Sequence, residues 1–302
     1  MPVVHPHDRR KSQLSNGIPK DVHDKLFETL NTDGVPVIDA SGLMAHLVNL
    51  EPISKLIVHD VGQGNAVGLY AKGNKLLGFI DCGRGVKQNA KTYSNKKLDE
   101  ITLTNDQFVL LTHWDKDHWA LGAWLDSGCN SKWFAPKQRV GPEGAAFIHH
   151  LLRNGRLHYI ESDKNILKFG ENIEIRQCNG FDKNNSGFSY LVKSDLKRVL
   201  LPGDASYSSI PWDVSDSPLR FHAVVAPHHG GICGMDVSVH PEAQGDSKLI
   251  YSVGRKNSFK HPRDVTIKFH ERHGWSVRQE NSVTLSTAGG NLGSQNDIIV
   301  DL

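Results

Sequence analysis

The sequence predicts a layered α/β or α+β protein, in which one β-sheet packs on another and helices cover the outside. From Lys55 onward, short apolar runs alternate with Gly, Asn and Asp residues, which is typical of strands bounded by turns. Segments with helical spacing of apolar residues lie between these runs. A chain of 302 residues, 38% of them hydrophobic, is long enough to bury the core of such a domain.

The apolar runs and the helical spacings locate the expected elements. A helix is expected at 21–30, where Val22, Leu26, Phe27 and Leu30 share one face, and a second around 43–48. We expect strands at 56–58, 66–70, 76–80, 108–111, 133–134, 173–175, 188–192, 199–201, 223–226 and 249–253. Further helices are expected at 119–125, 144–152 and 263–273. The change of character near residue 50 predicts a tail with a helical extension at 1–50 and a main domain at 51–302.

Composition restricts the function only weakly. The formal net charge of +2 neither requires nor excludes a nucleic-acid partner. The four cysteines are far apart and form no Cys-x-x-Cys pair, so a disulfide framework is not expected and a cytoplasmic location is the default. No apolar run approaches the roughly 18 residues of a membrane helix, so no membrane contact is expected. The 17 histidines are unusual, and histidine is the commonest metal ligand.

Residues of metal-binding type follow the apolar run at 108–111. His113, Asp115 and Asp117 alternate, so an extended chain would point them to one side, and the turn into the next helix would bring His118 to them. Two imidazoles and two carboxylates in one short stretch predict a metal site, and mixed nitrogen and oxygen ligands suit zinc, manganese or iron better than magnesium. The alternative is that Asp117 only caps the following helix.

Two other expected strands end in similar residues. The run at 199–201 leads to Gly203-Asp204, although a Gly-Asp pair alone is more often a plain turn. The run at 223–226 leads to His228-His229-Gly230-Gly231, for which a solvated histidine pair is the alternative. Adjacent residues of an extended chain point to opposite sides, so only one of these histidines is expected to bind a metal. Three such strand ends indicate one shared site.

Taken together, these motifs resemble the metallo-β-lactamase superfamily, most closely the hydrolase domain of ComEC-like (DNA-internalisation competence) proteins. The resemblance extends over most of residues 55–285 and rests on the order His-x-Asp-x-Asp-His, Gly-Asp, His-His-Gly. Other matching stretches are 60–66, 79–83, 184–186, 252–255 and 261–262. The resemblance implies an α+β fold, a four-layer αββα metallo-β-lactamase-like sandwich, with the hydrolase domain at 51–302.

The resemblance also implies the site residues and the cofactors. Two divalent metal ions, zinc or manganese, would be held by His113, Asp115, Asp117, His118, Asp204 and His229. Asp204 would bridge the ions, and His228 would face the substrate. Asp81 would orient the ligands without binding an ion itself. Asn257 and His261 would approach the phosphate or the leaving group, and Asn185 would also contact the substrate.

The sequence departs from this family pattern at three places, one of which is Asn65, where ComEC-like sequences commonly have an aspartate. Asp115 stands where the superfamily more usually has a histidine, which gives a harder site that suits manganese as well as zinc. The histidine often found before the bridging aspartate is missing, and Asn184 or Asn185 occupies that region. An amide or a water would then complete the shell of one ion, which would be bound more weakly.

The resemblance favours a binuclear phosphodiesterase or nuclease acting on nucleic acid or nucleotides. Two ions roughly 3.5–4 Å apart would activate a water and clamp the attacking and leaving oxygens. Asp117 would orient that water as a ligand, and His228 or His261 would stabilise charge on a phosphoryl oxygen or protonate the leaving group. Arg84 and Lys87 begin a basic loop that would follow a phosphate backbone, although a solvated loop is equally compatible.

Two other classes of function remain open. The same metal ions would serve to hydrolyse a small ester, a lactone or a phosphocholine-type substrate, and the shape of the pocket mouth would distinguish this class: a wide basic groove or a closed apolar pit. A non-catalytic module that keeps the fold is the second alternative. A protein partner or a homo-oligomer is compatible with either class.

Overall fold

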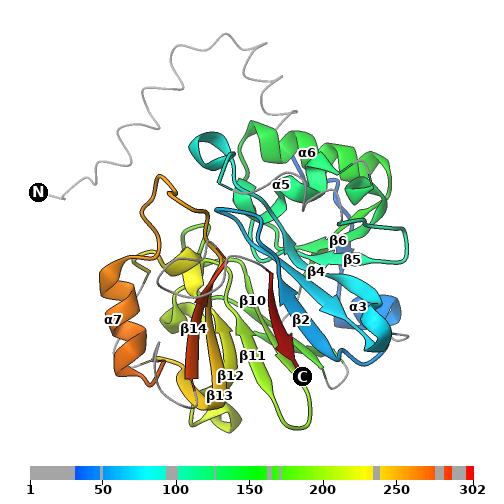
Figure 1. Ribbon diagram of the computed structural model, residues 1–302. Helices are drawn as coiled ribbons and strands as arrows, with labels where there is room; N and C mark the ends of the chain where they lie inside the picture. Colours follow the sequence, from blue (N-terminus) through cyan, green and yellow to red (C-terminus); the bar gives the residue numbers. More distant parts are fainter. Residues whose placement is uncertain are drawn as a thin grey trace, which may run out of the picture.

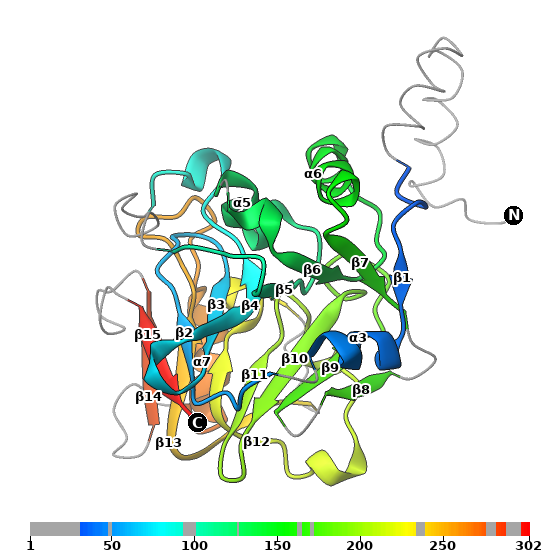
Figure 2. The same ribbon diagram turned by 90° about the vertical axis from the view of Figure 1, so that its right-hand side faces the viewer.

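Two β-sheets pack face to face in the protein, and helices cover both outer faces (Figures 1 and 2). The computed structural model describes residues 31–47, 50–92, 101–125, 127–161, 165–169, 172–233, 239–275, 282–287 and 297–302. Within them the predicted four-layer αββα sandwich is confirmed. The helix expected at 21–30 lies outside the described residues.

The first sheet has the strand order β1-β7-β6-β5-β4-β3-β2-β15. Pairing is parallel from β1 to β4 and antiparallel from β4 to β15. Its strands are β1 (Val37–Ile38), β2 (Lys55–Val58), β3 (Ala66–Tyr70), β4 (Leu76–Cys82), β5 (Phe108–Leu110), β6 (Lys132–Ala135), β7 (Leu157–Ile160) and β15 (Ile298–Asp301).

The second sheet has the order β14-β13-β12-β11-β10-β9-β8. Its strands β11 to β14 are parallel, whereas β8 to β11 pair in antiparallel fashion. The strands are β8 (Ile166–Phe169), β9 (Ile173–Gln177), β10 (Phe188–Lys193), β11 (Arg198–Leu201), β12 (Arg220–Val225), β13 (Glu242–Tyr251) and β14 (Ser282–Ser286). Strands β1, β7, β8, β14 and β15 were not expected from the sequence, and the short apolar runs at these positions explain why.

Alternating side chains of the central strands enter different layers of the core. In β5, Leu110 points into the core between the sheets, whereas Val109 packs under the helices of the first sheet. In β11, Leu201 faces the other sheet and Leu200 faces the outer layer. Both faces of these strands are therefore buried, which is why they read as continuous apolar runs rather than as alternating ones.

Four α-helices lie around the sandwich within the described part of the chain. Helices α5 (Lys116–Trp124) and α6 (Pro142–Arg153) cover the first sheet, and α7 (Asp264–Arg272) covers the second (Figure 1). Helix α3 (Ala40–Leu47) lies near β1 and β8 (Figure 2). Since β1 pairs with β7, residues 37–47 of the expected N-terminal extension are part of the sandwich. No helix of the described residues is long and apolar enough to cross a membrane.

The start of α5 differs from the sequence expectation in a way that affects the site. The expected helix began at residue 119, whereas α5 begins at Lys116, directly after Asp115 in extended conformation. Asp117 therefore lies in the first turn of the helix, where its negative charge is favourable to the helix dipole.

Candidate metal centre

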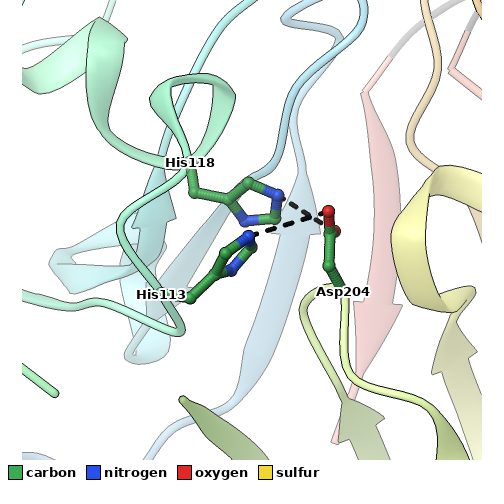
Figure 3. Close-up of side chains that lie close together, drawn as sticks. All are labelled: His113, His118 and Asp204. Carbon is green, nitrogen blue, oxygen red and sulfur yellow. Dashed lines mark ion pairs between the residues drawn. The ribbon is translucent and has the colours of Figure 1, made fainter. Parts of the chain in front are cut away.

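The predicted metal ligands meet where the carboxyl ends of parallel strands from both sheets come together. His113 follows β5, Asp204 follows β11 and His229 follows β12, and these strands belong to the parallel parts of the two sheets. Figure 3 shows the side chains of His113 and His118 pointing at the carboxylate of Asp204 from the opposite sheet. The three strand ends singled out in the sequence thus form one cluster.

Asp204 lies at the centre of the cluster and is 4% exposed. Its Oδ1 atom lies 3.0 Å from Nε2 of His118 and 3.7 Å from Nε2 of His229. Its Oδ2 atom lies 3.7 Å from Nε2 of His113 and 3.8 Å from Nε2 of His228. Each carboxylate oxygen thus faces its own pair of imidazoles, which is the arrangement expected of a bridging ligand.

The two aspartates of the 113–118 stretch lie with different imidazoles. Oδ2 of Asp115 is 3.5 Å from Nε2 of His113, whereas Oδ2 of Asp117 is 3.5 Å from Nε2 of His229. The prediction that His113, Asp115 and Asp117 share one side rested on an extended chain. Because the chain becomes helical at Lys116, Asp117 is instead directed toward His229.

The donor set fits divalent metal ions. Among the buried atoms without a hydrogen-bond partner are Nε2 of His113, His118 and His229 and Oδ1 of Asp204. Burying such atoms without a partner is costly unless something binds them. Ligands about 2.1 Å from a tetrahedral ion stand roughly 3.4 Å apart, close to the separations observed here. Two sets of donors converge closely enough to hold an ion: His113, His118 and Asp204, and Asp117, His118 and His229.

Hydrogen bonds on the side away from the cluster determine which ring nitrogen of His118 and of His229 faces the cluster. Nδ1 of His118 donates to Oδ2 of Asp81 at 2.7 Å, and Nδ1 of His229 donates to the carbonyl of Ser252 at 2.8 Å. In both rings Nδ1 is therefore engaged as a donor and Nε2 is the nitrogen directed at the cluster, as metal ligation requires. Thr112, which precedes His113, donates to the same Asp81 carboxylate.

His228 and His229 do not follow the extended geometry assumed from the sequence. Their φ angles are 50° and 55°, so both residues lie in the left-handed region and both rings reach Asp204. The two rings differ in their hydrogen bonds. Nδ2 of Asn184 lies 3.3 Å from Nδ1 of His228, and because the amide nitrogen only donates, the His228 proton lies on Nε2. This tautomer suits a hydrogen-bond donor to a substrate, whereas that of His229 suits a ligand.

The electrostatics of the cluster keep its carboxylates ionised. Burial opposes ionisation of Asp204, but the positive charges of His118 and His229 outweigh it and hold its pKa well below the usual value. Burial likewise opposes ionisation of Asp117, and the neighbouring imidazoles of His229 and His118 lower its pKa. The Asp204 and Asp81 carboxylates raise the pKa of His118 despite its burial. Buried negative charge of this kind is what a divalent cation neutralises.

Lys183 occupies the region where the family resemblance lacks a histidine. Its Nζ atom lies 2.7 Å from Oδ1 of Asp115, while Oδ2 of the same carboxylate faces His113. Burial opposes ionisation of Asp115, and the neighbouring imidazole of His113 and the hydrogen bond with Lys183 lower its pKa. Sequence reasoning missed Lys183, because a lysine in a polar loop forms no spacing pattern with residues 68 positions away.

His261 also reaches the site and has a defined tautomer. Nε2 of Gln63 lies 3.3 Å from Nδ1 of His261, so this ring accepts at Nδ1 and carries its proton on Nε2. Its ring centroid lies 5.6 Å from that of His228. Burial and the positive charges of His229 and His228 lower the pKa of His261 to about 4, so the ring is neutral at neutral pH.

The two asparagines predicted to contact a substrate use their amides within the protein. Oδ1 of Asn185 accepts from the backbone and hydroxyl of Ser206 and from the hydroxyl of Ser209, and its Nδ2 donates to Asp182. Asn257 donates to the carbonyls of Gly254 and His261 and accepts from the backbone of His261. Both amides therefore hold loops around the site in place.

The two predicted basic residues lie at the edge of the site. The guanidinium of Arg84 stacks over the ring of Trp124 at 4.8 Å. Lys87 is exposed and lines a cavity that also reaches Asp115 and Asp117. Lys87 thus shares a cavity with two candidate ligands, whereas Arg84 lines a neighbouring hollow.

Comparison with known proteins supplies similar folds only. No family model and no curated protein matches the sequence. A metal-dependent hydrolase of the beta-lactamase superfamily, Tm1679, is 13% identical, with 82% of this chain and 99% of that chain covered and a TM-score of 0.46. Zn(2+)-bound PqqB from Methylobacterium extorquens is 10% identical, with 80% and 88% covered and a TM-score of 0.46.

A third similar structure is only partly covered. The hydrolase AbOPH, of the beta lactamase superfamily, is 16% identical at a TM-score of 0.33, and the match spans 47% of this chain and about half (56%) of that protein. With such identities and TM-scores, none of these likenesses assigns an activity to the chain. What the fold and the side chains themselves define is an αββα sandwich with a buried His/Asp cluster at the ends of its parallel strands.

Proposed function

We propose that this protein is a metal-dependent hydrolase that binds two divalent ions, zinc or manganese, and cleaves phosphodiesters of nucleic acid or nucleotides. The observation that carries the proposal is the position of Asp204. Its two buried oxygens each face a pair of imidazoles within 3.0–3.8 Å, and several of these atoms have no partner in the protein. A purely structural cluster would satisfy these atoms with hydrogen bonds.

The residues around the cluster have different roles in the proposed reaction. Bound divalent ions would lower the pKa of a water and neutralise charge on a phosphoryl group. Asp117 and His229 hold one ion from one side, and Asp115 and His113 provide donors on the other. On the His113 side, Lys183 pairs with Asp115 at 2.7 Å, and its positive charge competes with an ion there, which supports weaker binding of the second ion.

His228 and His261 are placed to stabilise negative charge. The hydrogen bonds from Asn184 and Gln63 leave the proton of each ring on Nε2, and the two rings lie beside each other. Two N–H donors near a metal site would stabilise charge that develops on phosphoryl oxygens. Since His261 has a pKa of about 4, it acts better as a neutral donor than as the acid that protonates the leaving group.

The decisive experiment combines metal analysis with hydrolysis of bis-p-nitrophenyl phosphate, DNA, RNA and cyclic nucleotides. We expect bound zinc or manganese and metal-dependent cleavage, and Asp117→Ala should lower kcat/KM about a hundredfold or more. Asp106→Ala, which removes an exposed carboxylate away from the site, is the matched control and should be silent. A protein that binds no metal, or that cleaves only esters or lactones, would refute the proposal.

A further inference from the structure

A cavity of about 430 Å³ opens directly beside the candidate metal centre. Its lining includes the ligand carboxylates of Asp115 and Asp117, so a molecule in the cavity would touch the reacting site. The first-sheet half of the sandwich contributes Lys87, the Trp114–Trp119 stretch and the start of α6, and the second half contributes Lys183 and Phe259. The volume is in the range of roughly 300–1,000 Å³ that holds one small organic ligand.

The aromatic part of the lining is built to contact a flat apolar group. Nε1 of Trp114 donates to the carbonyl of Pro136, and Nε1 of Trp119 donates to the carbonyl of Trp114. The indole N–H groups are therefore occupied, and both side chains are buried, with 2% of Trp114 and 4% of Trp119 exposed, so they form the floor of the cavity. Trp119 is fixed by stacking on Phe147, with centroids 5.0 Å apart. Phe259, from the segment between β13 and α7, is 49% exposed and can contact a ligand directly.

The charges of the lining favour an anion over a cation. Three lysines (Lys87, Lys116, Lys183) and three carboxylates (Asp115, Asp117, Glu143) line the cavity. Lys116 pairs with Glu143 and Lys183 pairs with Asp115, each at 2.7 Å, and Asp115 and Asp117 also belong to the candidate metal cluster. Divalent ions on these two aspartates would leave the cavity with net positive charge. Such a cavity attracts a phosphate and repels a trimethylammonium group, which argues against phosphocholine.

We propose that this cavity binds one nucleoside unit of the substrate, with its base against the exposed ring of Phe259, above the buried floor of Trp114 and Trp119, and its phosphate near Lys87 and Lys183. The inference rests on the proposed function, because it places this unit beside the metal-bound phosphodiester. A cavity with room for one such unit favours nucleotides and chain ends over the interior of a long strand.

The test is the binding of AMP, ribose 5-phosphate and phosphocholine to the metal-loaded protein, measured by titration calorimetry. Stacking of a base on aromatic side chains contributes about 1–3 kcal/mol, so AMP should bind about tenfold more tightly than ribose 5-phosphate. Phe259→Ala should remove most of this preference. Phe181→Ala is the matched control, since Phe181 is fully exposed and is not part of the lining, and it should keep the preference.

The contribution of charge is tested separately. Lys87→Gln should weaken AMP and ribose 5-phosphate by the same factor, because both carry the phosphate, whereas Lys91→Gln, at an exposed lysine outside the lining, should weaken neither. Equal affinity for AMP and ribose 5-phosphate, or a preference for phosphocholine, would overturn the nucleoside subsite even if phosphodiesters are cleaved. An AMP preference that Phe259→Ala abolishes, in a protein that cleaves no phosphodiester, would support the subsite and refute only the proposed function.

Discussion

Oδ2 of Asp81 accepts a hydrogen bond from Nδ1 of His118 at 2.7 Å, and both side chains are almost completely buried. The same carboxylate accepts from the backbone and hydroxyl of Thr112 and from Nδ2 of Asn65. Asp81 is thus fixed at the end of β4 and in turn fixes the orientation and tautomer of His118. On its other side, Nε2 of His118 lies 3.0 Å from Oδ1 of Asp204.

Replacing this carboxylate tests whether it prepares His118 for metal binding. Asp81→Asn keeps the size of the side chain, and asparagine tolerates the φ of 54° at this position. We expect metal affinity to fall about 10–100-fold, because a neutral amide oxygen accepts the hydrogen bond of His118 more weakly than the Asp81 carboxylate does. Competition with a chromophoric chelator measures the affinity. Unchanged affinity, with the fold intact by circular dichroism, would show that Asp81 has only a structural role.

Gly83 provides a test of how closely β4 and α5 must approach. A Cβ atom at Gly83 would stand 1.7 Å from the carbonyl oxygen of Asp117, which is far inside contact distance. Gly83→Ala should therefore displace the start of α5, lower the free energy of unfolding by about 1–3 kcal/mol or more, and weaken metal binding. Gly141→Ala is the control, because a Cβ atom there meets nothing within 4 Å. Equal urea midpoints for the two variants would contradict this packing.

The hydrogen bonds of His228 and His229 predict different roles for the two rings. His229→Ala should remove one metal ion per protein, because it deletes a buried Nε2 that faces Asp117 and Asp204. His228→Ala should retain that ion and lower kcat, because this ring is a donor positioned by Asn184. Metal-to-protein ratios and steady-state kinetics on both variants separate the effects. Loss of the same ion from both variants would mean that His228 is also a ligand.

His270 predicts an acid sensitivity of the fold away from the metal centre. Its two ring nitrogens bond to the hydroxyls of Tyr207 and Tyr251 at 2.9 and 3.0 Å, and burial lowers its pKa to about 3. In the unfolded chain its pKa is about 6.5. As the pH falls, His270 is therefore protonated in the unfolded state before it is protonated in the folded state. The contribution of the neutral His270 to the free energy of unfolding is complete above pH 6.5 and is lost as the pH falls toward 3.

Because of this difference in pKa, the free energy of unfolding should be about 2 kcal/mol lower at pH 5 than at pH 7. Urea unfolding at the two pH values should show this loss in the wild type and a smaller loss in His270→Gln, in which the titrating ring is absent. Other histidines titrate in both proteins, so the comparison isolates His270. The same pH dependence in the two proteins would exclude this residue as the cause.

The sequence by itself determined the sandwich and the composition of the cluster. Apolar runs that lead to His113, Asp204 and His229 were sufficient to predict that these candidate ligands lie at strand ends and share one site. The elements that it missed, such as β8 and β14, are short and lie at or next to a sheet edge, where a weak apolar pattern is enough for pairing.

Only the tertiary structure decided how individual side chains are used. The left-handed backbone at 228–229 turns both imidazoles toward Asp204, which an extended chain would not do. The amides of Asn185 and Asn257 are engaged in holding loops, and Lys183 reaches Asp115 across the site. These outcomes depend on backbone dihedral angles and on hydrogen bonds between residues far apart in the chain, and neither is encoded in the local spacing of residue types.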